Sequence, residues 1–309
     1  MIKCVPAVDL LFENVRDKGH VCVGLDTASD YVPPTERKKA SGAAGAVLAF
    51  NRAVIDATFD VAACYKVQIA YYEEMGLEGL KTYSDTLKYI REKRGLVIAD
   101  IKRGDIADTA KRYAQAHFSG DFEADFVTLS PYMGMDSIEP WVSQAYTRGK
   151  GAFVLMRTSN PGMRDFEYLQ LTDGESASEK PVSQKRLYHA VGDKMAELAH
   201  QYRGGYDYGI FGVVTGCTER EEAAEIREKY PHLFFLIPGY GAQGGAAEDA
   251  ALLLKNGNGG VVNASRSIIT AWIRETDDPE KADNAFAAEA ARRAVIKMRD
   301  EIRTAAGCV

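Results

Sequence analysis

Eight short apolar runs, rich in β-branched residues, recur along the chain and alternate with stretches of helical periodicity. The runs predict β-strands at 21–26, 62–68, 96–102, 125–129, 152–158, 209–215, 233–237 and 260–264. The stretches between them predict helices that include 43–59, 77–93, 109–118, 187–203, 220–230, 246–255 and 267–276. Strand alternating with helix is typical of parallel β/α units, and a count of eight predicts an α/β fold closed as a single (β/α)8 TIM barrel.

An open, doubly wound sheet is the alternative fold for this alternation. Such a sheet usually carries a glycine-rich fingerprint after its first strand, and Gly24-Leu25-Asp26-Thr27-Ala28 is not one. No linker divides the chain, so we expect residues 1–309 to form one catalytic barrel domain, with an extra N-terminal helix from Val8 and a C-terminal helix at 279–305. Two irregular inserts, 27–37 and 160–186, follow the first and fifth strands. Both are expected on the catalytic face, the second as a mobile surface loop.

Composition and charge narrow the class of protein. With 46% hydrophobic and 27% charged residues, and no apolar run long enough to span a bilayer, the chain is expected to be a globular enzyme without a membrane partner. A formal net charge of −6 disfavours nucleic acid as a partner. The five cysteines stand singly, which argues for reduced thiols and against structural zinc. The first residues lack the apolar core of a signal peptide, so we expect a cytoplasmic location.

The richest polar motif follows the third predicted strand and reads Asp100-Ile101-Lys102-Arg103-Gly104-Asp105. Successive strand side chains alternate between the two faces, so Asp100 and Lys102 are expected on the same side at the carboxyl end of the strand. Ligands bind at that end in α/β proteins. A structural ion pair with a solvated Asp105 and a helix N-cap would give the same pattern. The other strand ends favour a functional site.

Charged and polar residues also stand at the ends of other predicted strands. They are Asp26, Lys66 with Gln68, Ser159 with Asn160, Gln243 and Arg266. A lysine at a strand end can simply extend its ammonium group to solvent, but a half-buried lysine is costly unless it is paired. We therefore expect Lys66 and Lys102 to pair with the carboxylates in an alternating array at the mouth of the barrel.

Two segments near the end of the chain predict a phosphate site. Residues 238–245 form a glycine-rich loop whose N–H groups can surround an anion at a helix N-terminus. Residues 263–267 bring a second helix start and the guanidinium group of Arg266, which suits bidentate contact with phosphate. These loops follow the last two predicted strands, where (β/α)8 barrels bind phosphate.

Six motifs together resemble the orotidine 5′-phosphate decarboxylase family, specifically its longer bacterial-type branch. They lie at 23–26, 65–73, 100–109, 130–134, 158–162 and 238–245, in the expected order over nearly the whole length. The Asp-x-Lys-x-x-Asp pattern alone is shared with related barrel decarboxylases and synthases. Two departures, Thr215-Gly216-Cys217 in place of a more apolar run and Ser265 where the family often has glycine, are not expected to touch the charged array.

The resemblance implies conversion of orotidine 5′-monophosphate to UMP and CO2, the last step of de novo UMP biosynthesis, with no metal and no organic cofactor. The implied catalytic residues are Lys102, Asp100, Asp105 and Lys66. Lys102 would stabilise the carbanion at C6 of the pyrimidine and protonate it. Asp105 would crowd the departing carboxylate. With Ile106 and Thr109 it would enter the site of the partner subunit, so the functional unit would be a homodimer.

The resemblance also assigns the residues that bind the substrate. They are Asp26, Gln68, Ile106, Thr109, Ser159, Asn160, Gln243, Ser265 and Arg266. Asp26 would bind a ribose hydroxyl, and Ser159 would read the amide edge of the pyrimidine. Gln243, Ser265 and Arg266 would hold the phosphate.

Two other functions remain open from the sequence. One is a related Mg²⁺-dependent sugar-phosphate decarboxylase or synthase, but such enzymes carry a carboxylate on the second strand where this chain has Lys66. The other is a non-catalytic binder of phosphorylated ligands, which would not need a lysine placed as an acid.

Overall fold

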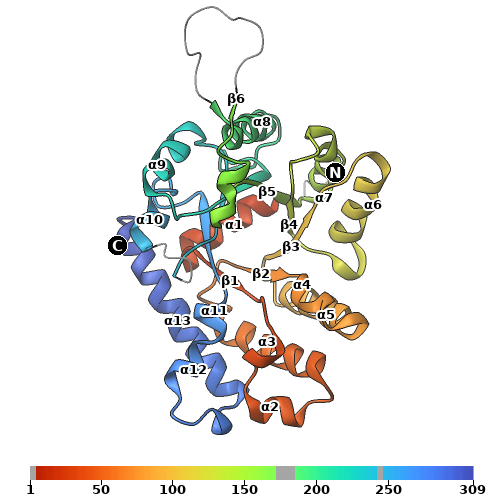
Figure 1. Cartoon of the computed structure of the whole chain (residues 1–309), viewed down its shortest axis with the longest axis vertical. Coiled ribbons are helices and arrows are strands. Elements are labelled where there is room, and N and C mark those ends of the chain that lie inside the picture. Colours follow the sequence, from red (N-terminus) through yellow and green to blue (C-terminus); the bar gives the residue numbers. More distant parts are fainter. Residues whose placement is uncertain (1–4, 172–184, 242–245, 309) are drawn as a thin grey trace, which may run out of the picture.

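The computed structural model describes residues 5–171, 185–241 and 246–308, and its centre is a closed eight-stranded barrel (Figure 1). The barrel strands are β1 (Val21–Gly24), β2 (Cys64–Gln68), β3 (Val97–Arg103), β4 (Phe126–Leu129), β5 (Gly151–Arg157), β8 (Phe211–Thr215), β9 (Phe235–Ile237) and β10 (Gly260–Ala264). All pair in parallel in chain order, and β10 closes the barrel against β1. The predicted (β/α)8 barrel is confirmed, with strand bounds within two residues of the predicted ones.

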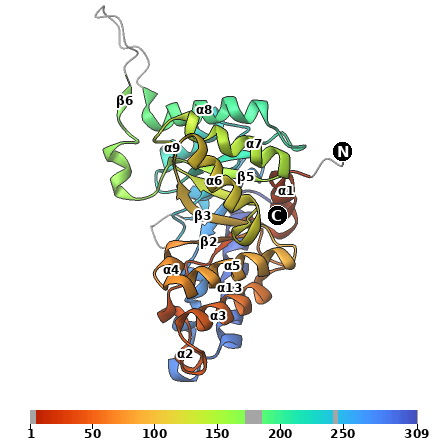
Figure 2. The same cartoon turned by 90° about the vertical axis from the view of Figure 1, so that its right-hand side faces the viewer.

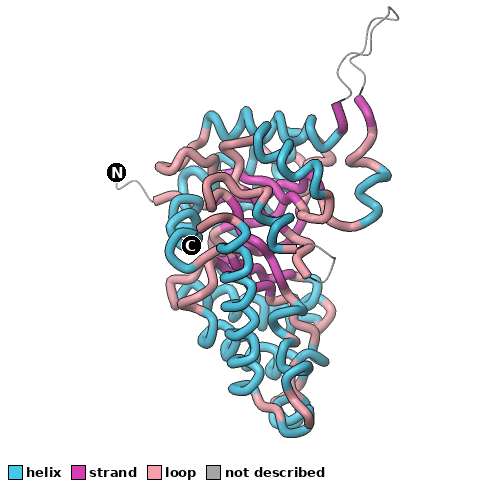
Figure 3. The backbone as a smooth tube through the Cα atoms, turned by 90° about the vertical axis from the view of Figure 1, so that its left-hand side faces the viewer, coloured by secondary structure: helices cyan, strands magenta, loops and turns pink. Residues whose placement is uncertain are grey.

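Helices surround the barrel on its outside (Figure 2, Figure 3). The longer ones are α1 (Ala7–Lys18), α3 (Ala43–Thr58), α5 (Gly76–Glu92), α6 (Ala107–Phe118), α7 (Glu139–Arg148), α8 (Leu187–Gln201), α9 (Arg220–Lys229) and α13 (Asn284–Ala305). The short ones are α2 (Pro34–Lys39), α4 (Ala70–Glu73), α10 (Ala247–Ala251), α11 (Arg266–Ile269) and α12 (Ala271–Glu275). Single 3-10 turns lie at Ser29–Tyr31, Gly120–Phe122, Met135–Ser137, Pro161–Asp165 and Pro279–Lys281. Helices α2, α4 and α7 lie outside the predicted helices.

Three predicted helices near the end of the chain are shorter than expected. The predicted helix at 267–276 divides into α11 and α12, because Thr270 leaves the helical conformation (ψ 13°) and its hydroxyl donates to the carbonyl of Arg266 at 2.6 Å. The last helix begins at Asn284, because Asp283 caps it by accepting a hydrogen bond from the N–H of Phe286 at 2.8 Å. Helix α10 ends at Ala251 instead of reaching 255.

Both inserts contain regular structure. The insert at 27–37 holds the 3-10 turn Ser29–Tyr31 and the start of α2. The insert at 160–186 holds the 3-10 turn Pro161–Asp165 and a two-stranded antiparallel sheet of β6 (Gln170–Leu171) and β7 (Lys185–Arg186). The sequence predicts that this insert is a mobile loop. Its residues 172–184 lie outside the described residues.

Helix α1 covers the end of the barrel at which the strands begin. Hydrogen bonds join it to the loops before β2, β5 and β8: Asn14 to Ala63 at 2.9 Å, Ala7 to Gly149 at 2.7 Å, and Gly205 to Asp9 at 2.8 Å. On the outer wall, α3 packs against both α5 and α13 (Figure 2). Because α1 covers one end of the barrel, the open mouth is the other end, where the strands have their carboxyl ends. Within the described residues, every helix is too short or too polar to cross a membrane.

Candidate active site

A cavity of about 600 Å³ opens at the carboxyl ends of the barrel strands. The structure brings together around it these predicted residues: Asp26, Lys66, Gln68, Asp100, Lys102, Ser159, Asn160, Ser265 and Arg266. Seven polar lining residues are not among the predicted site residues: Tyr31, Tyr71, Thr128, Thr158, Tyr240, Asn263 and Ser267. Thr128 and Asn263 each stand at the penultimate position of a predicted strand, which is the sequence signal that could have identified them.

The centre of the site is a chain of alternating charges from three neighbouring strand ends. Lys66 Nζ lies 2.9 Å from Asp26 Oδ1 and 3.0 Å from Asp100 Oδ2. Lys102 Nζ lies 2.7 Å from Asp100 Oδ1. The second oxygen of Asp26 accepts a hydrogen bond from Ser265 Oγ at 2.8 Å, which connects the array to the end of β10. The alternating array predicted from the sequence is therefore present in the structure. The expectation that the departure at Ser265 does not touch the charged array is wrong, because the serine hydroxyl binds Asp26 directly.

Asp100 is the carboxylate that contacts both lysines of this array. Its buried carboxylate accepts four hydrogen bonds, from Lys66, Lys102, Gln68 Nε2 at 3.0 Å and Thr128 Oγ1 at 2.8 Å. Burial alone would raise the pKa of Asp100, but the charges of the two lysines lower it well below its usual range. Burial alone would lower the pKa of Lys66, but Asp100 and Asp26 raise it above its usual range. Both groups are therefore charged at neutral pH.

Lys102 is directed into the cavity by an irregularity in β3. The register between β3 and β4 shifts between Ala99 and Arg103, and Lys102 has a positive φ of 44°, which is rare for a residue with a β-carbon. Thr128 Oγ1 stabilises this bulge by accepting hydrogen bonds from the N–H groups of Ile101 and Lys102, each at 3.0 Å. The Lys102 side chain is 47% exposed while that of Asp100 is 7% exposed, so the lysine is the accessible member of the pair.

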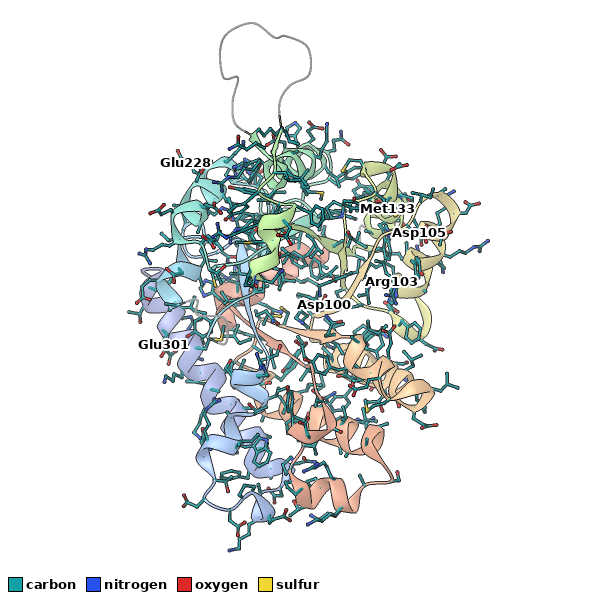
Figure 4. All side chains as sticks on the ribbon, in the orientation of Figure 1. Asp100, Arg103, Asp105, Met133, Glu228 and Glu301 are labelled. Atoms are coloured by element: carbon teal, nitrogen blue, oxygen red, sulfur yellow. The ribbon has the colours of Figure 1, made fainter. Side chains whose placement is uncertain are left out.

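Three predicted residues lie outside this cavity. Asp105, Ile106 and Thr109 do not line it, and Figure 4 shows Asp105 displaced from Asp100 toward α6. The Asp105 carboxylate accepts a hydrogen bond from the N–H of Ile106 at 2.8 Å. Ile106 and Thr109 are exposed. In an isolated chain these residues do not contribute to the site.

The predicted phosphate end of the cavity combines a glycine loop with an arginine. Gly239 and Gly241 have φ values of 101° and 70°, a backbone conformation that favours glycine. Between them, Tyr240 donates a hydrogen bond from its hydroxyl to Glu301 of α13 at 2.5 Å, which ties the loop to the outer helix. Arg266 lines the cavity, is exposed, and forms no ion pair within the described part of the chain. Gln243 lies outside the described residues.

These features define a class of protein: a (β/α)8-barrel enzyme with a buried charge array beside an arginine and a glycine-rich loop. The profile of the orotidine 5′-phosphate decarboxylase / HUMPS family matches residues 19–285. A relative named orotidine 5′-phosphate decarboxylase from Clostridium perfringens is 54% identical over 96% of this chain and 98% of its own length. A relative of the same name from Clostridium kluyveri is 50% identical over 96% of both chains.

Solved structures agree with the sequence comparisons. The OMP decarboxylase of Leishmania donovani is 30% identical, with a TM-score of 0.69 over 96% of this chain and all of that chain. A structure from Streptomyces avermitilis has a TM-score of 0.77 at 28% identity, over 99% of this chain and 98% of that chain. The chain belongs to the orotidine 5′-phosphate decarboxylase family.

Proposed function

We propose that the cavity at the mouth of this barrel decarboxylates orotidine 5′-monophosphate to UMP and CO2, the final step of UMP biosynthesis, as in the family to which the chain belongs. The observation that carries the proposal is the ammonium group of Lys102, which lines the cavity 2.7 Å from the buried carboxylate of Asp100. A positive charge fixed beforehand is what the reaction requires, because negative charge develops on a carbon atom that cannot delocalise it.

The chemistry follows from the position of that charge. When the bond between C6 and the carboxylate breaks, its electron pair stays on C6 in the plane of the pyrimidine ring, where the ring carbonyls cannot accept it. Lys102 stabilises this carbanion and transfers a proton to C6. Its amine then recovers a proton from solvent. Asp100, which is itself held by Lys66, keeps the ammonium group in place throughout, so little reorganisation is needed as the charge moves.

The remaining lining residues bind the parts of the substrate that do not react. Asp26 binds a ribose hydroxyl next to Lys66, and Asp100 and Lys66 also contact the ribose. Ser159 reads the amide edge of the pyrimidine, and Gln68 and Asn160 line the same cavity. Ser265, Arg266 and Gln243 hold the phosphate. Binding energy from the distant phosphate then contributes to the rate at C6.

We further propose that the working enzyme is a homodimer with shared active sites. Asp105, Ile106 and Thr109 would reach the partner's cavity, with Asp105 next to the departing CO2. Exposed apolar side chains support this: Tyr132, which is 83% exposed, and Met133 follow β4, and Ile106 follows β3. A second copy of the chain would cover these side chains. The free thiols of Cys22, Cys64, Cys217 and Cys308 are consistent with a cytoplasmic enzyme.

Loss of the absorbance of orotidine 5′-monophosphate in the presence of purified protein tests this function directly. The same assay in excess EDTA separates the rival, a Mg²⁺-dependent sugar-phosphate enzyme. In this chain the ammonium group of Lys66 lies between the carboxylates of Asp26 and Asp100, at 2.9 and 3.0 Å, where a divalent cation would need oxygen ligands. We expect full activity in EDTA. Activity that EDTA removes and Mg²⁺ restores would favour the rival.

A further inference from the structure

The turn that carries Ser159 and Asn160 lies beyond the last residue of β5, Arg157, so the ladder of the barrel does not hold it. Both residues nevertheless line the cavity. Their position therefore depends on contacts made by the turn itself. Thr158, the first residue of the turn, contacts Glu167 of the insert.

Glu167 reaches back from the insert and binds Thr158 through both carboxylate oxygens. Its Oε2 accepts the N–H of Thr158 at 2.9 Å, and its Oε1 accepts the hydroxyl of Thr158 at 2.8 Å. Glu167 is itself anchored, since its N–H donates to the carbonyl of Met163 at 2.8 Å and its carbonyl accepts the N–H of Tyr188 at 3.1 Å. The hydroxyl of Thr158 also lies 2.8 Å from Asn160 Oδ1, so its single proton has two acceptors, whereas the N–H of Thr158 donates to Glu167.

The opposite side of the turn is fixed by the end of β8. A β-carbon on Gly216 would lie 2.8 Å from the β-carbon of Ser159, so the two backbones approach as closely as glycine allows. The fully buried side chain of Arg157 donates to the carbonyl of Gly216 at 2.5 Å, and the N–H of Gly216 donates to the carbonyl of Arg157 at 2.8 Å. Ser159 is held between this contact and the turn that Glu167 binds.

We propose that Glu167 is a positioning residue for recognition of the pyrimidine, acting through Thr158 on Ser159 and Asn160. This inference rests on the proposed role of Ser159 in binding the base. Glu167 does not line the cavity, whereas Thr158, Ser159 and Asn160 do. Replacing Glu167 is therefore expected to weaken binding only of ligands that carry the pyrimidine. A contact that only stabilised the fold would affect all ligands of the cavity alike.

The experiment compares two ligands that share the phosphate and differ in the base. Glu167→Gln presents an amide N–H2 to one of the Thr158 donors, and Thr158→Val removes a hydroxyl that contacts both Glu167 and Asn160. For both variants we expect the Kd of UMP and the KM of orotidine 5′-monophosphate to rise about tenfold, as for one lost hydrogen bond to a charged group. The Kd of D-ribose 5-phosphate should stay unchanged. Thr158→Ser, which keeps the hydroxyl, should behave as the native chain.

The matched control is Glu219→Gln. Glu219 also binds the insert, through Arg164 at 2.8 Å, but does not contact Thr158. An equal rise in the Kd of UMP for Glu219→Gln, or a parallel loss of D-ribose 5-phosphate binding in Glu167→Gln, would overturn the inference. If Glu167→Gln does not fold, Glu167→Asp, which keeps the charge but shortens the side chain, carries the test, because Thr158 itself lines the cavity and its hydroxyl also contacts Asn160. A native chain that binds UMP with this dependence on Glu167 but does not convert orotidine 5′-monophosphate would refute the proposed function and leave the inference standing.

Discussion

Replacement of Lys102 by glycine and by alanine separates its chemistry from its backbone. At φ 44° a residue with a β-carbon is strained, and the left-handed conformation costs it roughly 1–2 kcal/mol. Glycine avoids this cost but loses more conformational freedom on folding, about 0.5–1 kcal/mol relative to alanine. We therefore expect the free energy of unfolding of Lys102→Gly to exceed that of Lys102→Ala by about 0.5–1 kcal/mol. Both variants should lack decarboxylase activity.

Lys66 provides the contrast within the same array. Its side chain is 7% exposed and bridges two carboxylates, so Lys66→Met leaves Asp100 and Asp26 partly unpaired and should cost about 3–5 kcal/mol of unfolding free energy. Lys102 is half exposed and has one ionic partner, so its loss should cost about 1 kcal/mol or less. Urea unfolding measures the stabilities, and the absorbance assay measures turnover. Appreciable turnover by Lys102→Ala, or an alanine variant more stable than the glycine variant, would refute this reasoning.

Three further predictions address the rest of the site. If Asp105 acts across a dimer, mixing inactive Lys102→Ala with Asp105→Ala should restore activity on subunit exchange, because one of the two sites then carries neither defect; proven exchange without recovery would place Asp105 in its own subunit's site. Arg266→Ala should lower kcat/KM for the nucleotide by orders of magnitude but scarcely change turnover of the free nucleoside, and phosphite should stimulate nucleoside turnover in the native chain far more than in the variant. Because the pKa of Asp100 is lowered, its charge stabilises the fold above about pH 4 and this contribution is lost as the pH falls; urea titrations should therefore show a shallower acid loss of stability in Asp100→Asn than in the native chain.

The barrel could be predicted from sequence because its strands are buried on both faces. Residues such as Val97, Ile98 and Ala99 are fully buried, so the strand reads as a continuous apolar run without alternation. The division between α11 and α12 could not be predicted in this way. It depends on the conformation of Thr270, and the helical periodicity of the sequence continues across that residue.

The composition of the candidate site was more predictable than its geometry. Polar residues at strand ends identified Asp26, Lys66, Asp100 and Lys102, because all carboxyl ends of a parallel barrel meet at one mouth. The alternation that placed Lys102 beside Asp100 assumes a regular strand, whereas β3 contains a bulge there. That bulge is held by a hydroxyl group 26 residues away in the sequence.

Glu167 shows a second limit of the sequence. It stands in an insert without periodicity, and its two hydrogen bonds to Thr158 depend on how the insert folds back on the end of β5. Asp105 shows a third limit. Its motif suggests a role in catalysis, but the cavity of its own chain does not include it, and the sequence does not contain the geometry of a second chain.

Burial separates the roles within the charged array. Asp100 accepts four hydrogen bonds in a buried position, so its carboxylate can neither move nor take up a proton easily at neutral pH. Lys102, bound to that carboxylate by a single ion pair, keeps about half of its side chain exposed to the cavity. The immobile anion sets the position of the cation, and the accessible cation meets the substrate. Neutralising Asp100 should therefore impair catalysis through the placement of Lys102, even though Asp100 takes no part in the proton transfer.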